Sequence, residues 1–377
     1  MNVKILHVIN NFSLTSIPVE MANLMGKTEH VDIMSLYDSN VSANKIAHQI
    51  APNCKKIIGY DFRNHPIKAR NKIKNDISVG EYDIIQVHHT ISGAIASSLM
   101  YKKSNTKIVI TVHGNYDSYT IKQNLITGYT FLHCDGIIAN SKTTLDSIWN
   151  WQKRFINRKY KKTIYNGINV NRIQAAPSEP CDLLCNQYNI KDDEYIFAQV
   201  GRLETVKNPL GTLRAFGLFV KKNSGLNTKL VFVGDGSQRR NIEEYIHENE
   251  FLTNRVVLTG MLKRDDVYSF MRRINTLVVP SMYEGFCNAL FEAMAMGVGL
   301  IVSDIPVFLE LIPESDEIKR IIPSDPKTIA NAMQQVTKEN RNSDSRTKLM
   351  KFARDKYDTS ICVQNYLNTD RHICSMV

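Results

Sequence analysis

Short apolar runs and amphipathic stretches alternate along most of the chain. In the first half, runs with the length and β-branched content of strands cover residues 3–9, 31–36, 83–88, 107–113, 136–140 and 162–165. Stretches with the helical spacing of apolar positions lie between them, at 19–25, 66–77, 91–102, 121–132 and 142–153. Strands that alternate with helices of this length predict βαβ units and a parallel sheet.

The alternation stops once and then restarts. Residues 172–192, which include Pro177 and Pro180, fit neither pattern and are expected to form a linker. Further strands are expected at 195–200, 229–233, 255–259, 276–280, 299–303 and 319–322. Helices are expected at 209–222, 237–249, 264–273, 288–296, 306–311 and 326–337, with a last helical tract from 346 to about 368. The chain is therefore predicted to form two Rossmann-like, doubly wound α/β domains that face each other across a cleft.

Composition fits this architecture. A length of 377 residues suits two domains, and 43% hydrophobic with 22% charged residues is ordinary for a globular protein. No apolar run has the length of a membrane span, and the first residues lead directly into a strand, so we expect neither a transmembrane helix nor a signal peptide. The seven cysteines lack zinc-site spacing and are expected to be reduced thiols in the cytoplasm.

Positive charge is concentrated in the first half. Residues 1–178 hold 22 Lys and Arg against 11 Asp and Glu, whereas the rest of the chain holds 25 against 26. Such an excess suits an acidic partner: anionic lipid headgroups, a polyphosphate or a nucleic acid. No recognition motif for nucleic acid accompanies the charge, so we do not expect that partner.

Polar signals follow three strands of the second half. Gly201 and Arg202 come directly after one strand, and Lys207 precedes the next helix. Two fixed cations near a helix N-terminus suit a diphosphate, although a surface loop would have the same composition. A second strand ends in Gly234 and Asp235, where a strand-to-helix turn alone would also call for glycine.

The third strand end carries two carboxylates. The strand at 276–280 leads through a short turn with Glu284 into a helix that holds Glu292. Free backbone amides at 286–288 are expected to face a phosphate or a sugar oxygen. Glu292 lies about two helical turns beyond Glu284, so the two are expected to contact different parts of one ligand.

Together these motifs resemble the donor-binding half of the family 4 glycosyltransferases, which are retaining enzymes of the GT-B fold, across residues 195–312. The resemblance implies that Arg202 and Lys207 hold the nucleotide diphosphate, that Glu284 contacts the donor sugar, and that Glu292 contacts the ribose. The base would lie near residues 260–262. The implied donor-binding set is Gly201, Arg202, Lys207, Gly234, Asp235, Met261, Leu262, Glu284, Gly285, Phe286, Cys287, Asn288, Ala289 and Glu292. Cys287 is expected to be a small residue where glycine is common, not a nucleophile.

The first half resembles the family less closely. His113 follows a strand and is similar to the active-site histidine of the family, although an ordinary strand-end histidine would look the same. His88 and His89 end another strand and are candidates for acceptor contact. The loop at 10–16 lacks the glycines usual there, and Val307 stands where glycine is common. The resemblance implies an acceptor domain over 1–175, completed by a helix at about 357–377, and a donor domain over 176–356.

The implied reaction is retaining, metal-independent hexosyl transfer. The catalytic set would be His113, Arg202, Lys207 and Glu284. The sequence contains no Asp-x-Asp motif, so no metal is expected, and no cofactor beyond a UDP- or GDP-linked sugar as co-substrate. We hypothesise same-face attack, in which the leaving phosphate assists deprotonation of a glycan or lipid-linked acceptor during cell-envelope polysaccharide synthesis.

Basic residues of the first half gather in two clusters. One holds Lys55, Lys56, Arg63, Lys68, Arg70, Lys72 and Lys74, and the other holds Trp149, Trp151, Lys153, Arg154, Phe155, Arg158, Lys159, Lys161 and Lys162. Cations beside aromatic residues suit peripheral binding to the anionic inner face of the cell membrane, and they equally suit a solvated basic surface. Two alternatives to transfer remain: a nucleotide-sugar epimerase of the same fold, and a binding partner without catalysis.

Overall fold

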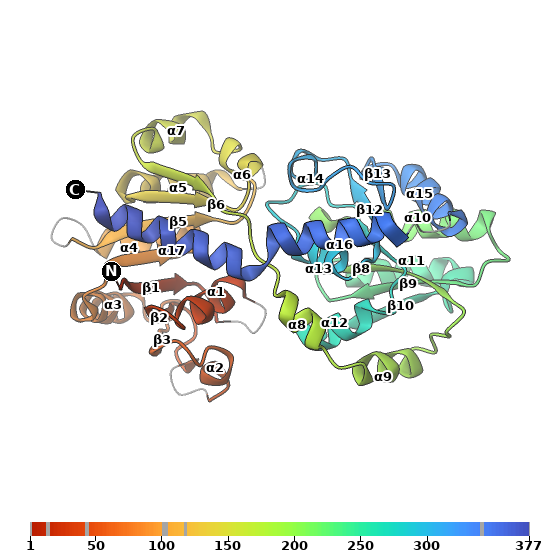
Figure 1. Ribbon diagram of the computed structural model, residues 1–377, viewed down its shortest axis with the longest axis horizontal. Helices are drawn as coiled ribbons and strands as arrows, with labels where there is room; N and C mark the ends of the chain where they lie inside the picture. Colours follow the sequence, from red (N-terminus) through yellow and green to blue (C-terminus); the bar gives the residue numbers. More distant parts are fainter. Residues whose placement is uncertain are drawn as a thin grey trace. The chain divides into compact units, whose positions relative to one another are not determined.

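The computed structural model describes residues 2–12, 16–41, 45–99, 105–116, 119–339 and 343–376. It divides into two compact units (Figure 1). The first unit comprises Met1–Gly167 and Thr359–Val377, and the second comprises Ile168–Asp358. Among the described residues, no helix combines the length and the apolar character that crossing a bilayer requires.

The first unit is built on a parallel sheet of order β3-β2-β1-β4-β5-β6-β7. Its strands are β1 (Lys4–Ile9), β2 (His30–Ser35), β3 (Lys56–Gly59), β4 (Ile84–Val87), β5 (Lys107–Val112), β6 (Gly136–Ala139) and β7 (Tyr160–Thr163). Its helices are α1 (Ile17–Met25), α2 (Lys45–Ile50), α3 (Pro66–Gly80), α4 (Thr90–Leu99), α5 (Ile121–His133), α6 (Lys142–Asp146), α7 (Asn150–Ile156) and α17 (Thr359–Ser375). The strand order reverses between β1 and β4, where doubly wound sheets place their ligands.

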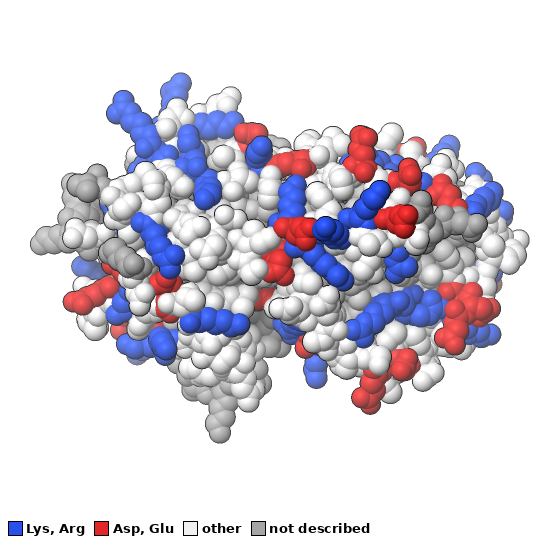
Figure 2. All heavy atoms as spheres, viewed as in Figure 1, with Lys and Arg blue, Asp and Glu red and all other residues white. Residues whose placement is uncertain are grey.

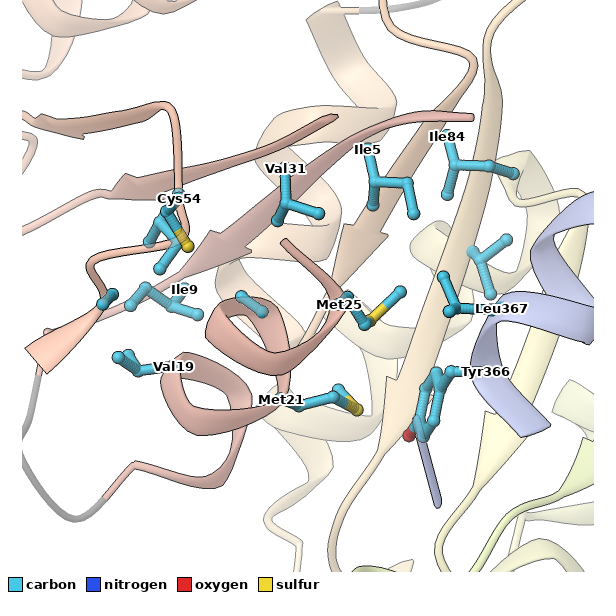
Figure 3. Packing of buried hydrophobic residues seen from close by; sticks show 14 of the residues in the cluster. Ile5, Ile9, Val19, Met21, Met25, Val31, Cys54, Ile84, Tyr366 and Leu367 are labelled. Atoms are coloured by element: carbon cyan, nitrogen blue, oxygen red, sulfur yellow. The ribbon is translucent and has the colours of Figure 1, made fainter. Parts of the chain in front are cut away.

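Apolar side chains cover both faces of this sheet. On one face, Met21 and Met25 of α1 and Ile5 of β1 belong to one buried apolar cluster (Figure 3). Tyr366 and Leu367 of α17 join the same cluster, so the end of the chain helps to close the core of its beginning.

The second unit repeats the plan with a parallel sheet of order β10-β9-β8-β11-β12-β13. Its strands are β8 (Tyr195–Val200), β9 (Thr228–Val233), β10 (Val256–Gly260), β11 (Thr276–Val279), β12 (Gly299–Ser303) and β13 (Ile318–Ile321). Its helices are α8 (Val170–Ala175), α9 (Glu179–Gln187), α10 (Pro209–Lys222), α11 (Arg239–Glu248), α12 (Arg264–Met271), α13 (Asn288–Ala295), α14 (Pro306–Leu311), α15 (Pro326–Lys338) and α16 (Ser343–Tyr357). The order reverses between β8 and β11, so the loops after these strands are the ones expected to meet a ligand.

The predicted linker at 172–192 is wrong. Most of this segment is helical. Pro180 is compatible with α9 because it occupies the first turn, where a backbone N–H would have no hydrogen-bond partner within the helix. Both α8 and α9 pack against α12 of the second unit. The structural division therefore falls after Gly167 instead of after residue 175.

Other departures concern short or interrupted elements. The edge strand β3 was not predicted, and its first residue is the charged Lys56. The predicted helix at 142–153 is two short helices, α6 and α7. The last helical tract is also two helices, α16 and α17, which meet at Asp358 and belong to different units.

Candidate functional site

The loops after β8 and β11 meet at the point where the strand order of the second unit reverses. The amide of Met282 donates to the carbonyl oxygen of Val206 at 2.8 Å. Beside this bond, Lys207 Nζ forms an ion pair with Glu284 Oε1. Two residues that lie 77 positions apart in the sequence are thereby joined at one site.

Both members of this ion pair are held by further contacts. Ser281 Oγ donates to Glu284 Oε1 at 2.7 Å, and Gln199 Nε2 donates to the carbonyl oxygen of Lys207 at 2.7 Å. Burial disfavours the ammonium, but Cys287 and Glu284 outweigh burial, so the pKa of Lys207 is raised. Burial also raises the pKa of the Cys287 thiol, to about 11, so at neutral pH this thiol is uncharged.

Glycines bring the loops after β8 and β9 together. Gly201 has φ +139° and Gly234 has φ +134°, both in the region that favours glycine. A Cβ on Gly234 would lie 2.0 Å from the carbonyl oxygen of Gly201, closer than any side chain permits. Arg202 follows Gly201 in the loop after β8. Its side chain is exposed and makes no ion pair among the described residues. Asp235 is occupied locally, by the amide of Gly236 at 2.8 Å and by Arg239 at 3.4 Å.

The turn before α13 presents backbone donors. Within the described residues, the amides of residues 285–289 have no hydrogen-bond partner, and Asn288 Nδ2 is buried without one. Cys287 caps α13 without a side-chain hydrogen bond, so the positive end of the helix dipole stays open. Phe286 is buried against Phe291, with ring centroids 4.4 Å apart, so only its amide is offered to a ligand.

Glu292 is fixed from the neighbouring helix α12. Its Oε1 accepts from Arg264 Nη2 at 2.9 Å and from Tyr268 OH at 2.8 Å. Its Oε2 accepts no hydrogen bond from the described residues, which leaves one oxygen for a ligand hydroxyl. Arg264 and Tyr268 were not among the predicted site residues, although their spacing of four on a predicted helix places them on one face.

The loop after β10 adjoins the loop after β9. The amide of Gly234 donates to the carbonyl oxygen of Gly260 at 3.0 Å. Met261 is 69% exposed, and Leu262 is half-buried. The structure thus places all members of the implied donor set at the carboxyl edge of one sheet, in the loops after β8, β9, β10 and β11 and in α13.

The first unit gathers histidines at its own reversal point. Nδ1 of His7 lies 2.8 Å from Nε2 of His88, and Nδ1 of His88 lies 3.1 Å from Nε2 of His113. Burial lowers the pKa of His7 and of His113 to about 3, and lowers the pKa of His88 well below its usual value. These lowered pKa values favour the neutral form of all three rings at physiological pH, in which each imidazole has one nitrogen that donates and one that accepts.

A cavity of about 520 Å³ opens beside these histidines. Its lining includes Asn10, His88, His89, Thr90, His113, Tyr116, Tyr119, Lys122 and Gln123. Part of the glycine-poor loop at 10–16 lies outside the described residues, namely 13–15. Asp38, which was not among the predicted site residues, holds the start of this loop by accepting from the amide of Phe12 at 2.5 Å and from Asn11 Nδ2 at 3.3 Å.

Two family models match the chain. Residues 22–172 match glycosyltransferase family 4, and residues 183–356 match glycosyl transferases group 1. An uncharacterized glycosyltransferase of Methanocaldococcus jannaschii is 28% identical over 251 residues, which is 63% of this chain and 59% of that protein. The UDP-Gal:alpha-D-GlcNAc-diphosphoundecaprenol alpha-1,3-galactosyltransferase of Escherichia coli is 26% identical over 231 residues, 60% of this chain and 58% of that protein. The chain thus matches less than two thirds of the length of these two relatives.

A solved structure has the same fold. HepE of Anabaena, determined in complex with UDP and glucose, superposes with a TM-score of 0.80 at 16% sequence identity. The match covers 98% of this chain and 100% of that one.

Proposed function

This chain belongs to the glycosyltransferases of the GT-B fold, with a family 4 domain followed by a group 1 domain, and from that premise we propose that it moves a hexosyl group from a nucleotide sugar to an acceptor hydroxyl. We further propose that transfer retains the anomeric configuration and needs no metal. The observation that carries the proposal is the ion pair of Lys207 and Glu284 beside the open amides of α13. A site with one fixed cation, one carboxylate and several free N–H groups suits a sugar joined to a diphosphate.

Each group has a role in the proposed donor complex. Arg202 and Lys207 contact the diphosphate, and they stabilise the negative charge that develops on it as the glycosidic bond breaks. Lys207 has three donors, so it can hold a phosphate oxygen while it keeps Glu284 in place. Glu284 accepts a hydroxyl of the donor sugar. Glu292 offers its second oxygen to the ribose.

We propose a UDP-linked donor ahead of a GDP-linked one. The galactosyltransferase of E. coli is named for UDP-Gal, and HepE was determined with UDP and glucose. The loop after β10, with Gly260 and Met261, is where we expect the base to lie. The acceptor we propose is a glycan carried on a lipid diphosphate, since the E. coli relative is named for such an acceptor.

The donor proposal is tested by binding and by turnover. We expect UDP to raise the melting temperature of the wild-type protein, because a ligand of the folded state stabilises it. In Lys207→Ala this increase should fall by more than half, while Lys222→Ala, which removes an exposed lysine of α10, should behave as wild type. An equal increase in both variants would refute the site. A radiolabelled donor supplied without acceptor separates transfer from epimerisation, because an epimerase would still convert it.

Helix α5 carries a surface that suits a lipid-borne acceptor. Its exposed side chains include Ile121, Leu125, Tyr129 and Leu132, which lie on one side of the helix. Their exposed fractions are 71%, 60%, 42% and 50%. The buried side of α5 holds Asn124, Thr127, Gly128, Thr130 and Phe131, so the amphipathic pattern is inverted with respect to the core.

Basic residues border this apolar stripe. Lys122 lies on α5, and Lys153 and Arg154 lie on α7, which packs against α5. Figure 2 shows Lys and Arg side chains over the part of the first unit around α7. Of the two tryptophans in the predicted basic cluster, Trp151 packs over Gly128 of α5, and Trp149 is partly buried against the core. An apolar stripe with a basic border suits an anionic bilayer surface, where each basic residue contributes roughly 1 kcal/mol.

Vesicle co-sedimentation tests this surface. We expect binding to vesicles with phosphatidylglycerol, little binding to pure phosphatidylcholine, and loss of binding in the double variant Leu125→Glu with Leu132→Glu. Leu183→Glu is the matched control, since Leu183 is 61% exposed on α9 of the second unit. Equal binding to both kinds of vesicle, or equal loss in the control, would remove the membrane proposal.

A further inference from the structure

Three histidines of the first unit, the buried His7 and His88 and the half-buried His113, form a continuous line of hydrogen bonds that ends at His113. His7 belongs to β1, and His88 and His113 follow β4 and β5, which are successive neighbours in the sheet. The rings of His7 and His88 are inclined by 7°, and those of His88 and His113 by 27°. Both nitrogens of His88 are engaged, one with each neighbour.

Neutral imidazoles each carry one N–H, so the line has only two proton arrangements. In one, His113 donates from Nε2 to His88, and His88 donates from Nε2 to His7. In the other, His7 donates from Nδ1 to His88, and His88 donates from Nδ1 to His113. The two hydrogen bonds couple the three rings, so the tautomer of His113 depends on the proton position in His7.

The buried end of the line selects between these arrangements. His7 Nε2 is buried and has no hydrogen-bond partner among the described residues. The first arrangement would place a proton on this nitrogen and leave a donor N–H unsatisfied in the core. Buried N–H groups without an acceptor are the rarest kind of unsatisfied polar group in native structures. The second arrangement avoids this, and it puts the proton of His113 on Nδ1.

We propose that His7 and His88 are positioning residues that hold His113 in the Nδ1–H tautomer, so that His113 donates a hydrogen bond to a sugar oxygen of a ligand. His113 uses Nε2 for its contact with His88, so only Nδ1 remains for a ligand, and the ring borders the cavity of the first unit. A neutral imidazole that donates at a fixed position can stabilise developing negative charge without releasing a proton. The identity of the ligand rests on the proposed function, whereas the tautomer does not.

Histidine tautomers are measured directly by long-range ¹H–¹⁵N correlation spectra of ¹⁵N-histidine-labelled protein. At pH 7 we expect His7, His88 and His113 to show the Nδ1–H pattern, and the exposed His48 and His65 to serve as solvent references. A proton on Nε2 of His113, or protonation of that ring near pH 6, would overturn the proposal.

Variants at the far end of the line test the coupling. His7→Leu removes the donor to His88, so we expect His113 to lose its single tautomer, and kcat to fall about tenfold with little change in KM. His7→Asn keeps an N–H near the position of Nδ1 and should restore both measurements toward wild type. Thr369→Val is the matched control, because Thr369 of α17 is buried in the same unit and donates to the carbonyl oxygen of Asn365 at 2.8 Å, outside the line and outside the cavity lining.

The outcomes separate this inference from the proposed function. An unchanged His113 tautomer or an unchanged kcat in His7→Leu would refute the coupling, as would equal losses in Thr369→Val. If the spectra show the expected tautomers and respond to His7→Leu, but no UDP-sugar is turned over by the wild-type protein, the positioning of His113 stands and the proposed transfer fails.

Discussion

The ion pair between Lys207 and Glu284 can be dissected by replacing its members singly and together. Lys207→Met leaves the carboxylate of Glu284 in a site where its side chain is 9% exposed. Removing one partner of a fully buried pair costs about 3–5 kcal/mol. Here the Lys207 side chain is 22% exposed, and Ser281 keeps its 2.7 Å hydrogen bond to the carboxylate, so we expect about 2 kcal/mol. In a unit of this size that loss lowers Tm by about 4–8 °C.

The double variant separates stability from catalysis. Lys207→Met combined with Glu284→Gln leaves no unpaired charge, so we expect at least half of the lost Tm to return. Activity should not return, because the positive charge that stabilises the leaving diphosphate is still missing. We expect kcat to fall by about 10²–10³ in the single Lys207 variant and to stay there in the double variant. Tm is measured by calorimetry, and transfer with a radiolabelled UDP-sugar.

The pH dependence gives an independent control on the same pair. The pKa of Lys207 is raised above its usual value of 10.5, so its stabilising contribution is complete below that pH. The contribution is lost as the pH rises through the value in the folded state, and the Tm of wild type and Lys207→Met should converge there. If Tm fails to recover in the double variant, or if kcat recovers with it, the ion pair does not have these two separate roles.

Three further predictions concern single positions. Gly234→Ala should destabilise the protein by about 1–3 kcal/mol and weaken UDP binding, because the added Cβ would meet the carbonyl of Gly201. Gly225→Ala is the control: a Cβ added there has no atom within 4 Å, so the melting temperature should not change. Burial raises the pKa of Asp370 to about 8. As the pH rises from 4 to 8, the wild-type protein should therefore lose stability relative to Asp370→Asn, by up to about 1.4 kcal/mol per pH unit. An equal difference in unfolding free energy between the two proteins at pH 4 and at pH 7, measured by denaturant unfolding, would contradict this. Cys287→Ala should keep kcat within about twofold, since burial raises the thiol pKa to about 11 and leaves no thiolate to act as a nucleophile.

The alternation of apolar runs and amphipathic stretches was enough to predict two parallel sheets, because strand and helix differ in the spacing of their buried positions. The pattern was less informative at a residue such as proline, which can either end a helix or begin one. Pro180 was read as a breaker, yet proline in the first turn of a helix is unstrained, and α9 begins around it. The edge strand β3 buries few of its side chains, so its pattern is weak.

The donor motifs could be predicted to converge, because loops that follow neighbouring parallel strands share one edge of a sheet. Which side chains touch could not be predicted. Lys207 and Glu284 were assigned to phosphate and sugar separately, and the structure joins them through loop conformations set by Gln199 and Ser281. His7 looked like one polar residue inside an apolar strand, and only the strand order places it against His88.

Helix α5 marks the limit of periodicity as a guide to burial. Apolar residues at positions 121, 125, 129 and 132 predict a helix and, by the usual rule, a face that packs on the core. In the structure that face is exposed and the opposite face is buried. On the buried face, Thr127 Oγ1 donates to the carbonyl oxygen of Gln123 at 2.8 Å, and Gln152 Nε2 donates to the carbonyl oxygen of Asn124 at 2.7 Å. A polar face can be buried when its groups are paired in this way. The pattern therefore fixes the helix and its two faces, while the partners of the polar side chains decide which face meets the solvent.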